Sequence, residues 1–98
     1  MSNKPEKEKD HWLLKRIIEA LYFLGGKGTL KEIYKYIGEN HKQNLTEYVD
    51  WTSAIRSQIY THSSDTSKFR GKTGDANDLF YAMQGKGKGI WGLRSHTK

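Results

Sequence analysis

The chain has 98 residues, which is room for one domain, and it lacks cysteine, which excludes both a disulfide scaffold and a thiolate metal site. The net charge of +6 is unevenly distributed: residues 51–98 hold eight Lys and Arg against three Asp and Glu, whereas residues 1–50 hold nine against eight. No apolar run reaches the roughly 20 residues of a membrane span and no signal peptide follows Met1, so we expect a soluble, intracellular protein.

The first part of the chain predicts a tail followed by a helix. Residues 1–10 alternate in charge without an apolar stripe, which is typical of a disordered tail. From His11 to Leu24 apolar residues recur at helical spacing, and Gly25 with Gly26 ends the segment. The predicted buried stripe consists of Leu14, Ile17, Ile18, Leu21 and Leu24.

Two more helices are predicted from their N-terminal caps. Thr29 and Glu32 have the spacing of a capping box, so a second helix starts there and ends near Gly38. Its buried stripe is Leu30, Ile33, Tyr34 and Ile37. The polar residues 39–45 form a turn, and Asp50 caps a third helix that runs to about Ser63. The inner face of this helix is Trp51, Ile55, Gln58, Ile59 and His62, and the outer face is Ser53, Arg56, Ser57 and Tyr60.

The rest of the chain predicts strands. Residues 64–78 are polar and glycine-rich, which indicates a long connection around a short strand at 68–70. Residues 79–83 and 90–94 are dense in strand formers, and the Gly/Lys loop 84–89 joins them as a hairpin. Three helices followed by a hairpin predict an α+β winged helix-turn-helix domain over residues 11–95, with 96–98 as a tail.

In a winged helix the third helix enters the major groove of DNA and the hairpin lies along the backbone. The positive excess of the C-terminal half falls on these two elements, as expected for a surface that binds a polyanion. Arg56 suits a bidentate contact to guanine, whereas Lys86 and Lys88 suit phosphates. The predicted DNA contacts are Thr52, Ser53, Arg56, Ser57, Tyr60, Lys68, Arg70, Lys72, Lys86, Lys88 and Arg94. Each has a structural alternative: Arg56 pairs with an acidic residue of an earlier helix, and Lys86 and Lys88 are ordinary turn lysines.

Signals for catalysis and cofactors are weak. Gly71-Lys72-Thr73 imitates the end of a phosphate-binding loop, but Thr66 replaces the required earlier glycine and no hydrophobic strand precedes it. The four histidines have no metal-ligand spacing. We therefore expect no enzymatic activity, no metal and no cofactor. Trp12, Trp51 and Trp91 are expected in the core rather than in a ligand site.

Four segments together resemble the HARE-type winged helices, a family found in chromatin proteins and fused to restriction endonucleases. They are HWLLKRIIEAL, TLKEIYKYI, HSSDTSKF and LFYAMQGKGKGIWGLR, and the resemblance covers most of residues 11–94. It implies a DNA-binding accessory module of the kind thought to sense modified bases, with any nuclease in a separate domain. The segment 64–78 departs from the family pattern, as an extra wing or a lid.

The sequence thus predicts a module that binds double-stranded DNA and targets an associated nuclease or chromatin protein. A methylated base is the modification considered, with Tyr60 as the contact to the methyl group and Trp51 as its neighbour. The expected location is with DNA, in the nucleoid of a bacterium or the nucleus of a eukaryote. The alternative is a winged helix that docks another protein without binding DNA.

Overall fold

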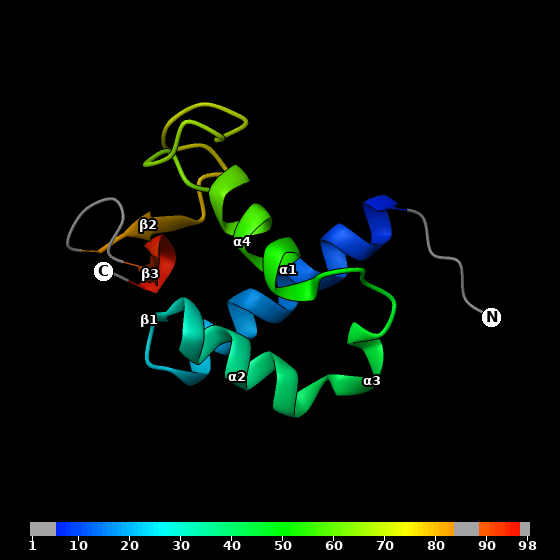
Figure 1. Ribbon diagram of the computed structural model, residues 1–98. Helices are drawn as coiled ribbons and strands as arrows, with labels where there is room; N and C mark the ends of the chain where they lie inside the picture. The colour runs from blue at the N-terminus through cyan, green and yellow to red at the C-terminus, as the bar shows by residue number, and fades with distance from the viewer. Residues whose placement is uncertain (1–5, 84–88, 97–98) are drawn as a thin grey trace.

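The computed structural model describes residues 6–83 and 89–96, and it is an α+β fold of four helices and a small antiparallel sheet (Figure 1). The helices are α1 (Glu6–Phe23), α2 (Leu30–Asn40), α3 (Lys42–Leu45) and α4 (Trp51–Thr61). The strands are β1 (Lys27–Thr29), β2 (Phe80–Ala82) and β3 (Ile90–Leu93), and a short 3₁₀ helix follows at Arg94–His96. Predictions for residues 1–5, for Lys86 and Lys88 and for residues 97–98 lie outside the described residues.

The start of α1 corrects the predicted tail. The helix begins at Glu6, so residues 6–10, expected to be disordered, are helical. The Lys9 ammonium donates to the Glu47 carbonyl at 3.3 Å, and the Tyr48 hydroxyl donates to the Lys9 carbonyl at 2.8 Å. Contacts with residues almost 40 positions away therefore hold a segment whose local sequence has no apolar stripe.

Helices α2 and α4 begin where their caps predicted, but α2 extends past Gly38 to Asn40, and residues 42–45, expected in a turn, form α3. The Thr29 hydroxyl accepts from the Glu32 amide at 3.0 Å, and the Glu32 carboxylate accepts from the Thr29 amide at 2.9 Å, which completes the capping box. Asp50 caps α4 by accepting from the Ser53 amide at 3.2 Å. Gly25 and Gly26, with φ of 88° and 99°, end α1 as expected, because few other residues adopt this left-handed backbone.

The sheet has the order β1-β3-β2 with both pairs antiparallel. Strands β2 and β3 confirm the predicted pairing, with Phe80 opposite Leu93 and Ala82 opposite Trp91. The sequence did not predict β1, in which Gly28 lies opposite Trp91. The strand predicted at 68–70 is wrong: this fully described stretch is irregular and is held by turn hydrogen bonds, such as the one from the Phe69 amide to the Thr66 carbonyl at 3.4 Å.

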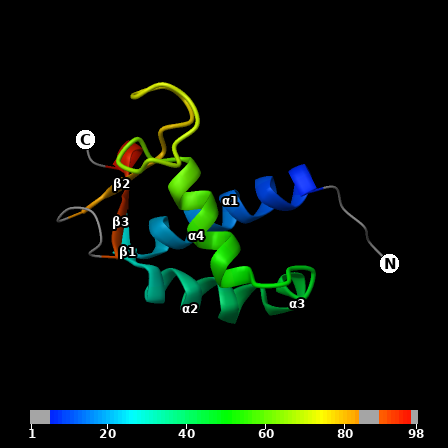
Figure 2. The same cartoon turned by 45° about the horizontal axis from the view of Figure 1, so that its top comes forward.

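One core joins the helices to the sheet. In the two views α4 crosses α1 and begins beside α2, and the sheet lies at one end of the helices (Figures 1 and 2). The buried residues are Leu13, Ile17, Ala20, Leu21, Ile33, Ile37, Leu45, Ile55, Ile59, Phe80, Trp91 and Leu93.

The buried stripe of α1 is rotated from the prediction, since Leu14, Ile18 and Leu24 are only partly buried. Trp91 is in the core as expected, whereas Trp12 and Trp51 are half-buried against it. No helix in the described part of the chain is both long and apolar enough to cross a membrane.

Candidate nucleic-acid interface

The N-terminus of α4 uses two of the predicted DNA-binding hydroxyls for its own cap. The Thr52 and Ser53 hydroxyls each donate to the Asp50 carboxylate at 2.8 Å. The hydrogen bond from the Ser53 side chain is the main reason that the pKa of Asp50 lies below its ordinary value, with a further contribution from Thr52. These hydroxyls therefore stabilise the charged cap, and only their oxygen lone pairs are left to accept hydrogen bonds.

Arg56 is exposed on the outer face of α4 and is oriented by two neutral groups. Its Nη2 donates to the Ser53 Oγ at 3.1 Å, and its Nη1 lies 3.5 Å from the Tyr34 hydroxyl of α2. The hydrogen bond to Tyr34 raises the pKa of Arg56 above its ordinary value. Among the ion pairs within residues 6–83 and 89–96, none involves Arg56. The alternative in which an acidic residue of an earlier helix neutralises Arg56 is therefore wrong.

A hollow of about 270 Å³ lies along the exposed side of α4, and we call it the α4 groove. Ser53, Arg56, Ser57, Tyr60, Thr61 and Lys68 line it. Tyr60 is half-buried and rests against Trp91, with ring centroids 5.7 Å apart and planes at 45°. Packing against the core thus fixes the ring in the wall of the groove. The groove brings together five of the predicted contacts and adds Thr61, which the prediction missed.

A second hollow, of about 450 Å³, continues round the C-terminal half of α4, and we call it the Arg70 hollow. It is lined by Asp10, Ser57, Gln58, Thr61, His62, Arg70 and Asn77. Ser57 and Thr61, one helical turn apart, line both hollows, so the two adjoin across this turn. Lys68 stands on one side of the turn and Arg70 on the other.

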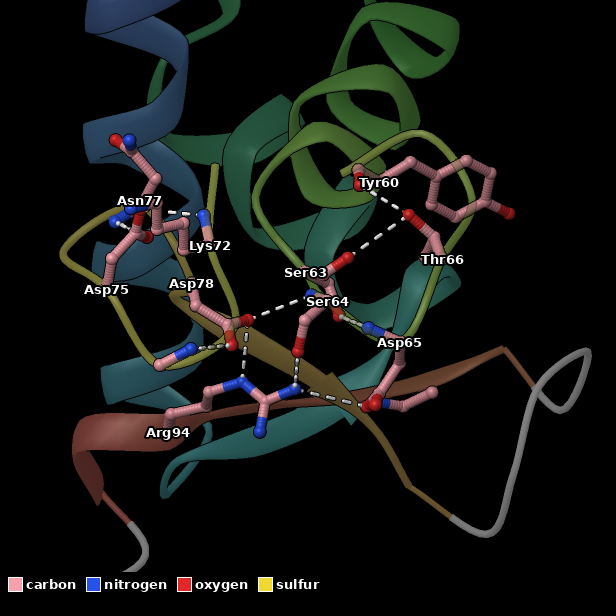
Figure 3. Close-up of polar contacts among 12 residues, drawn as sticks. Tyr60, Ser63, Ser64, Asp65, Thr66, Lys72, Asp75, Asn77, Asp78 and Arg94 are labelled. Atoms are coloured by element: carbon pink, nitrogen blue, oxygen red, sulfur yellow. Dashed lines mark hydrogen bonds and ion pairs between the residues drawn. The ribbon is translucent and has the colours of Figure 1, made fainter. Parts of the chain in front are cut away.

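Arg94 is used inside the protein rather than on the predicted DNA track. Its Nε donates to the Asp78 Oδ1 at 2.9 Å, and its Nη2 lies 3.3 Å from the Asp65 Oδ2 and 3.2 Å from the Ser64 Oγ (Figure 3). Two carboxylates thus balance the positive charge of this guanidinium. We therefore leave Arg94 out of the candidate interface.

Asp78 is the buried member of this cluster, with 1% of its side chain exposed. Burial alone would raise the pKa of its carboxyl, but hydrogen bonds from the Gly74 amide and from Ser64, together with the charge of Arg94, outweigh it. The pKa of Asp78 therefore lies below its ordinary value, and the carboxylate stays charged.

Trp51 and Tyr60 do not share a pocket. Trp51 packs edge-on against Tyr34, with centroids 6.1 Å apart. It lines a separate hollow of about 670 Å³ between α2, α3 and α4, which we call the aromatic hollow. Gly38, Glu39, Lys42, Leu45, Thr46 and Tyr48 complete its lining. The methyl-binding pair expected from the sequence is therefore not assembled.

Tyr34 is a site residue that the sequence did not reveal. Tyr34 was assigned to the buried stripe of α2, yet its hydroxyl faces Arg56. A buried tyrosine needs a polar partner for its hydroxyl, and this requirement was the available signal. Lys72 is exposed but lines neither hollow on α4.

No group of three or more histidine or acidic side chains that could hold a metal ion occurs within the described ranges. Comparisons of the chain with protein-family models, with curated proteins and with solved structures found no match.

Proposed function

We propose that this domain is a winged helix that binds double-stranded DNA, with α4 in the major groove. The order α1-β1-α2-α3-α4-β2-β3 supports this assignment, because the three longer helices α1, α2 and α4, with the four-residue α3 in the connection before α4, are followed by an antiparallel pair whose connection would serve as the wing. Helix α4 has 11 residues, a length of about 16 Å, and the major groove admits one α-helix.

The α4 groove is the observation that carries the proposal. Arg56 and Lys68 line it as cations together with four hydroxyl residues, and no carboxylate appears in its lining as far as the structure describes the chain. The one acidic residue at this end of α4, Asp50, is occupied by the cap. An ordinary solvated helix face alternates positive and negative charges, so a face without carboxylates favours a polyanionic ligand.

The residues divide into two roles. Arg56, held by Tyr34 and Ser53, is the contact to a guanine edge, and Ser57 and Tyr60 flank it. Lys86 and Lys88, in the connection between β2 and β3, contact the backbone irrespective of sequence. Because Tyr60 presents a fixed ring beside Arg56, it remains our candidate for contact with the methyl group of a modified base, without Trp51.

The resemblance to HARE-type winged helices supports a wider role as a targeting module. In this proposal the domain acts by binding alone and directs an associated nuclease or chromatin protein to DNA.

Protein docking is the second candidate, favoured by the aromatic hollow. Leu45, Tyr48 and Trp51 line this hollow, and Val49 beside it is fully exposed. A partner that fills it buries apolar surface, and such binding changes little with salt.

Fluorescence anisotropy of a labelled duplex, measured across a series of salt concentrations, separates the two candidates. DNA binding predicts that log K falls linearly with log salt, by about 0.9 for each phosphate contact. An affinity that does not change with salt, or no binding to any duplex at low salt, contradicts the proposal.

A further inference from the structure

We infer that residues 62–79, which we call the arm, form a second DNA-contacting element, in which Asp78 positions Lys68 and Arg70 beside α4. The inference rests on the proposed function, which already uses Lys68, and adds to it Arg70 and the positioning residue Asp78. The arm arches over the C-terminal end of α4 in both views (Figures 1 and 2).

The arm is irregular in backbone but tied to α4 at several points. The Leu79 and Phe80 amides both donate to the carbonyl of His62, the residue that caps α4 and begins the arm, at 2.8 and 3.1 Å. The Arg70 amide donates to the Thr61 carbonyl at 3.2 Å, and the Thr66 hydroxyl donates to the Tyr60 carbonyl at 2.6 Å (Figure 3). The carbonyl groups that end α4 are thereby satisfied by the arm, which folds back against the helix.

Asp78 joins distant parts of the arm through one buried carboxylate. Its Oδ1 accepts from the Ser64 amide at 2.8 Å and from Arg94 at 2.9 Å, and its Oδ2 accepts from the Gly74 amide at 2.9 Å. Arg94 follows β3, so this carboxylate ties both halves of the arm to the sheet (Figure 3). Replacement of the carboxylate by an amide leaves one of its two acceptor oxygens, so either the Gly74 amide or the Ser64 amide and Arg94 lose their acceptor, and Asp65 is then the carboxylate that still pairs with Arg94.

The acidic residues of the arm are bound internally. The Asp65 Oδ2 accepts from the Ala82 amide at 2.9 Å, and it also pairs with Arg94. Asp75 accepts from the Lys72 and Asn77 amides at 2.9 and 2.8 Å. By contrast, Lys68 and Arg70 are exposed and line the α4 groove and the Arg70 hollow.

The two cations therefore stand on either side of the turn of α4 that Ser57 and Thr61 mark. In this proposal a DNA backbone that crosses this turn contacts Arg56 and Lys68 in the α4 groove and Arg70 in the adjoining hollow, whose lining also includes Asp10. The competing explanation is that both cations only stabilise the negative end of the α4 dipole. That explanation predicts an effect on unfolding and none on DNA affinity.

The first test is the exposed double variant Lys68→Ala/Arg70→Ala in the full chain, with Lys15→Ala/Lys27→Ala as a control of equal charge on α1 and β1. Duplex affinity of the arm variant is expected to fall about ten-fold at physiological salt, and its salt slope to fall by up to about two, with the control close to wild type. Equal affinity and slope in both double variants overturn the inference, even if the arm variant melts at a lower temperature.

The second test is Asp78→Asn, which removes a negative charge and would strengthen DNA binding if charge alone mattered. Positioning predicts weaker binding by a similar factor, and no further loss when Asp78→Asn is added to the arm variant. Tighter binding, or additive losses, overturn the positioning role. If Asp78→Asn does not fold, Asp65→Asn, at a partly exposed residue, is measured instead, alone and combined with Lys68→Ala/Arg70→Ala. If the wild-type domain binds no duplex, the proposed function itself is wrong. If the wild type binds and the variants bind equally well, only the role of the arm is wrong.

Discussion

Tyr34 of α2 and Arg56 of α4 meet at 3.5 Å through the phenol oxygen and Nη1, although 22 positions separate them in the chain. The ring of Tyr34 packs against Trp51 at the start of α4, so the hydroxyl has a fixed position. A guanidinium held between two neutral oxygens keeps its charge and loses side-chain freedom before it meets DNA. If the domain binds DNA as proposed, we expect sequence preference to depend on Arg56.

Arg56→Ala is expected to cost about 1–3 kcal/mol on the preferred duplex and much less on random DNA, because the bidentate contact to guanine is lost. Tyr34→Phe keeps the packing on Trp51 and removes only the hydroxyl, so it is expected to give a smaller loss of the same kind. Titrations of each variant against both duplexes measure this. Equal losses on the two duplexes reduce Arg56 to a phosphate contact, and no loss on either supports protein docking.

Lys86→Ala combined with Lys88→Ala is expected to weaken binding to all duplexes alike and to reduce the salt slope by up to about two. Both lysines stand between glycines, with no acidic residue beside them in the sequence. The measurement is the salt dependence of affinity for two unrelated duplexes, with Lys15→Ala/Lys27→Ala as the matched control. A slope equal to that of the control places the wing outside the interface.

Tyr60 distinguishes a methyl contact from a phosphate contact. If the ring recognises a methylated base, Tyr60→Phe retains a preference for methylated duplex and Tyr60→Ala loses it, because phenylalanine keeps the ring that rests on Trp91. If the hydroxyl binds a phosphate, both variants weaken all DNA alike. Equal affinity of the wild-type domain for matched duplexes with and without adenine or cytosine methylation ends the methyl hypothesis.

The lowered pKa of Asp78 makes stability depend on pH in a defined direction. Because the pKa in the folded state lies below the ordinary value of 3.8, the carboxylate stabilises the fold fully above that value. This contribution is lost as the pH falls through the lower, folded-state pKa. The melting temperature of the wild type is therefore expected to fall below pH 3.8, and that of Asp78→Asn to be lower at neutral pH and to fall less in acid.

Glu39→Gln removes an exposed carboxylate of α2 and serves as the control, with a pH profile close to wild type. Parallel profiles for Asp78→Asn and wild type would show that the buried carboxylate does not contribute as the hydrogen bonds indicate.

The sequence predicted the parts of the fold that local chemistry determines. The capping box at Thr29 and the cap at Asp50 set the starts of α2 and α4, since a cap and its partners lie within three residues. Strand β1 escaped prediction because its three residues form a strand only by pairing with β3, more than 60 positions later. The start of α1 was missed for the same reason, since its anchor Tyr48 is distant in the chain.

The candidate site was likewise predictable where it depends on local sequence and not where it depends on contacts between distant residues. Helical periodicity placed Arg56, Ser57 and Tyr60 on one face of α4, and the structure brings them together in the groove. The sequence did not reveal that Arg94 is held by Asp65 and Asp78, because an exposed cation and a paired one look alike before the chain is folded. Nor did it show that Trp51 turns toward α2, away from Tyr60.

The most direct test of DNA binding through the α4 groove is a titration of the ¹⁵N-labelled domain with duplex DNA, followed by amide chemical shifts. Our account predicts that the largest shifts occur at Arg56, Ser57, Thr61 and Lys68, with little change at Leu45 and Tyr48 of the aromatic hollow. Large shifts confined to the aromatic hollow, with the α4 groove unchanged at saturating duplex, would contradict it.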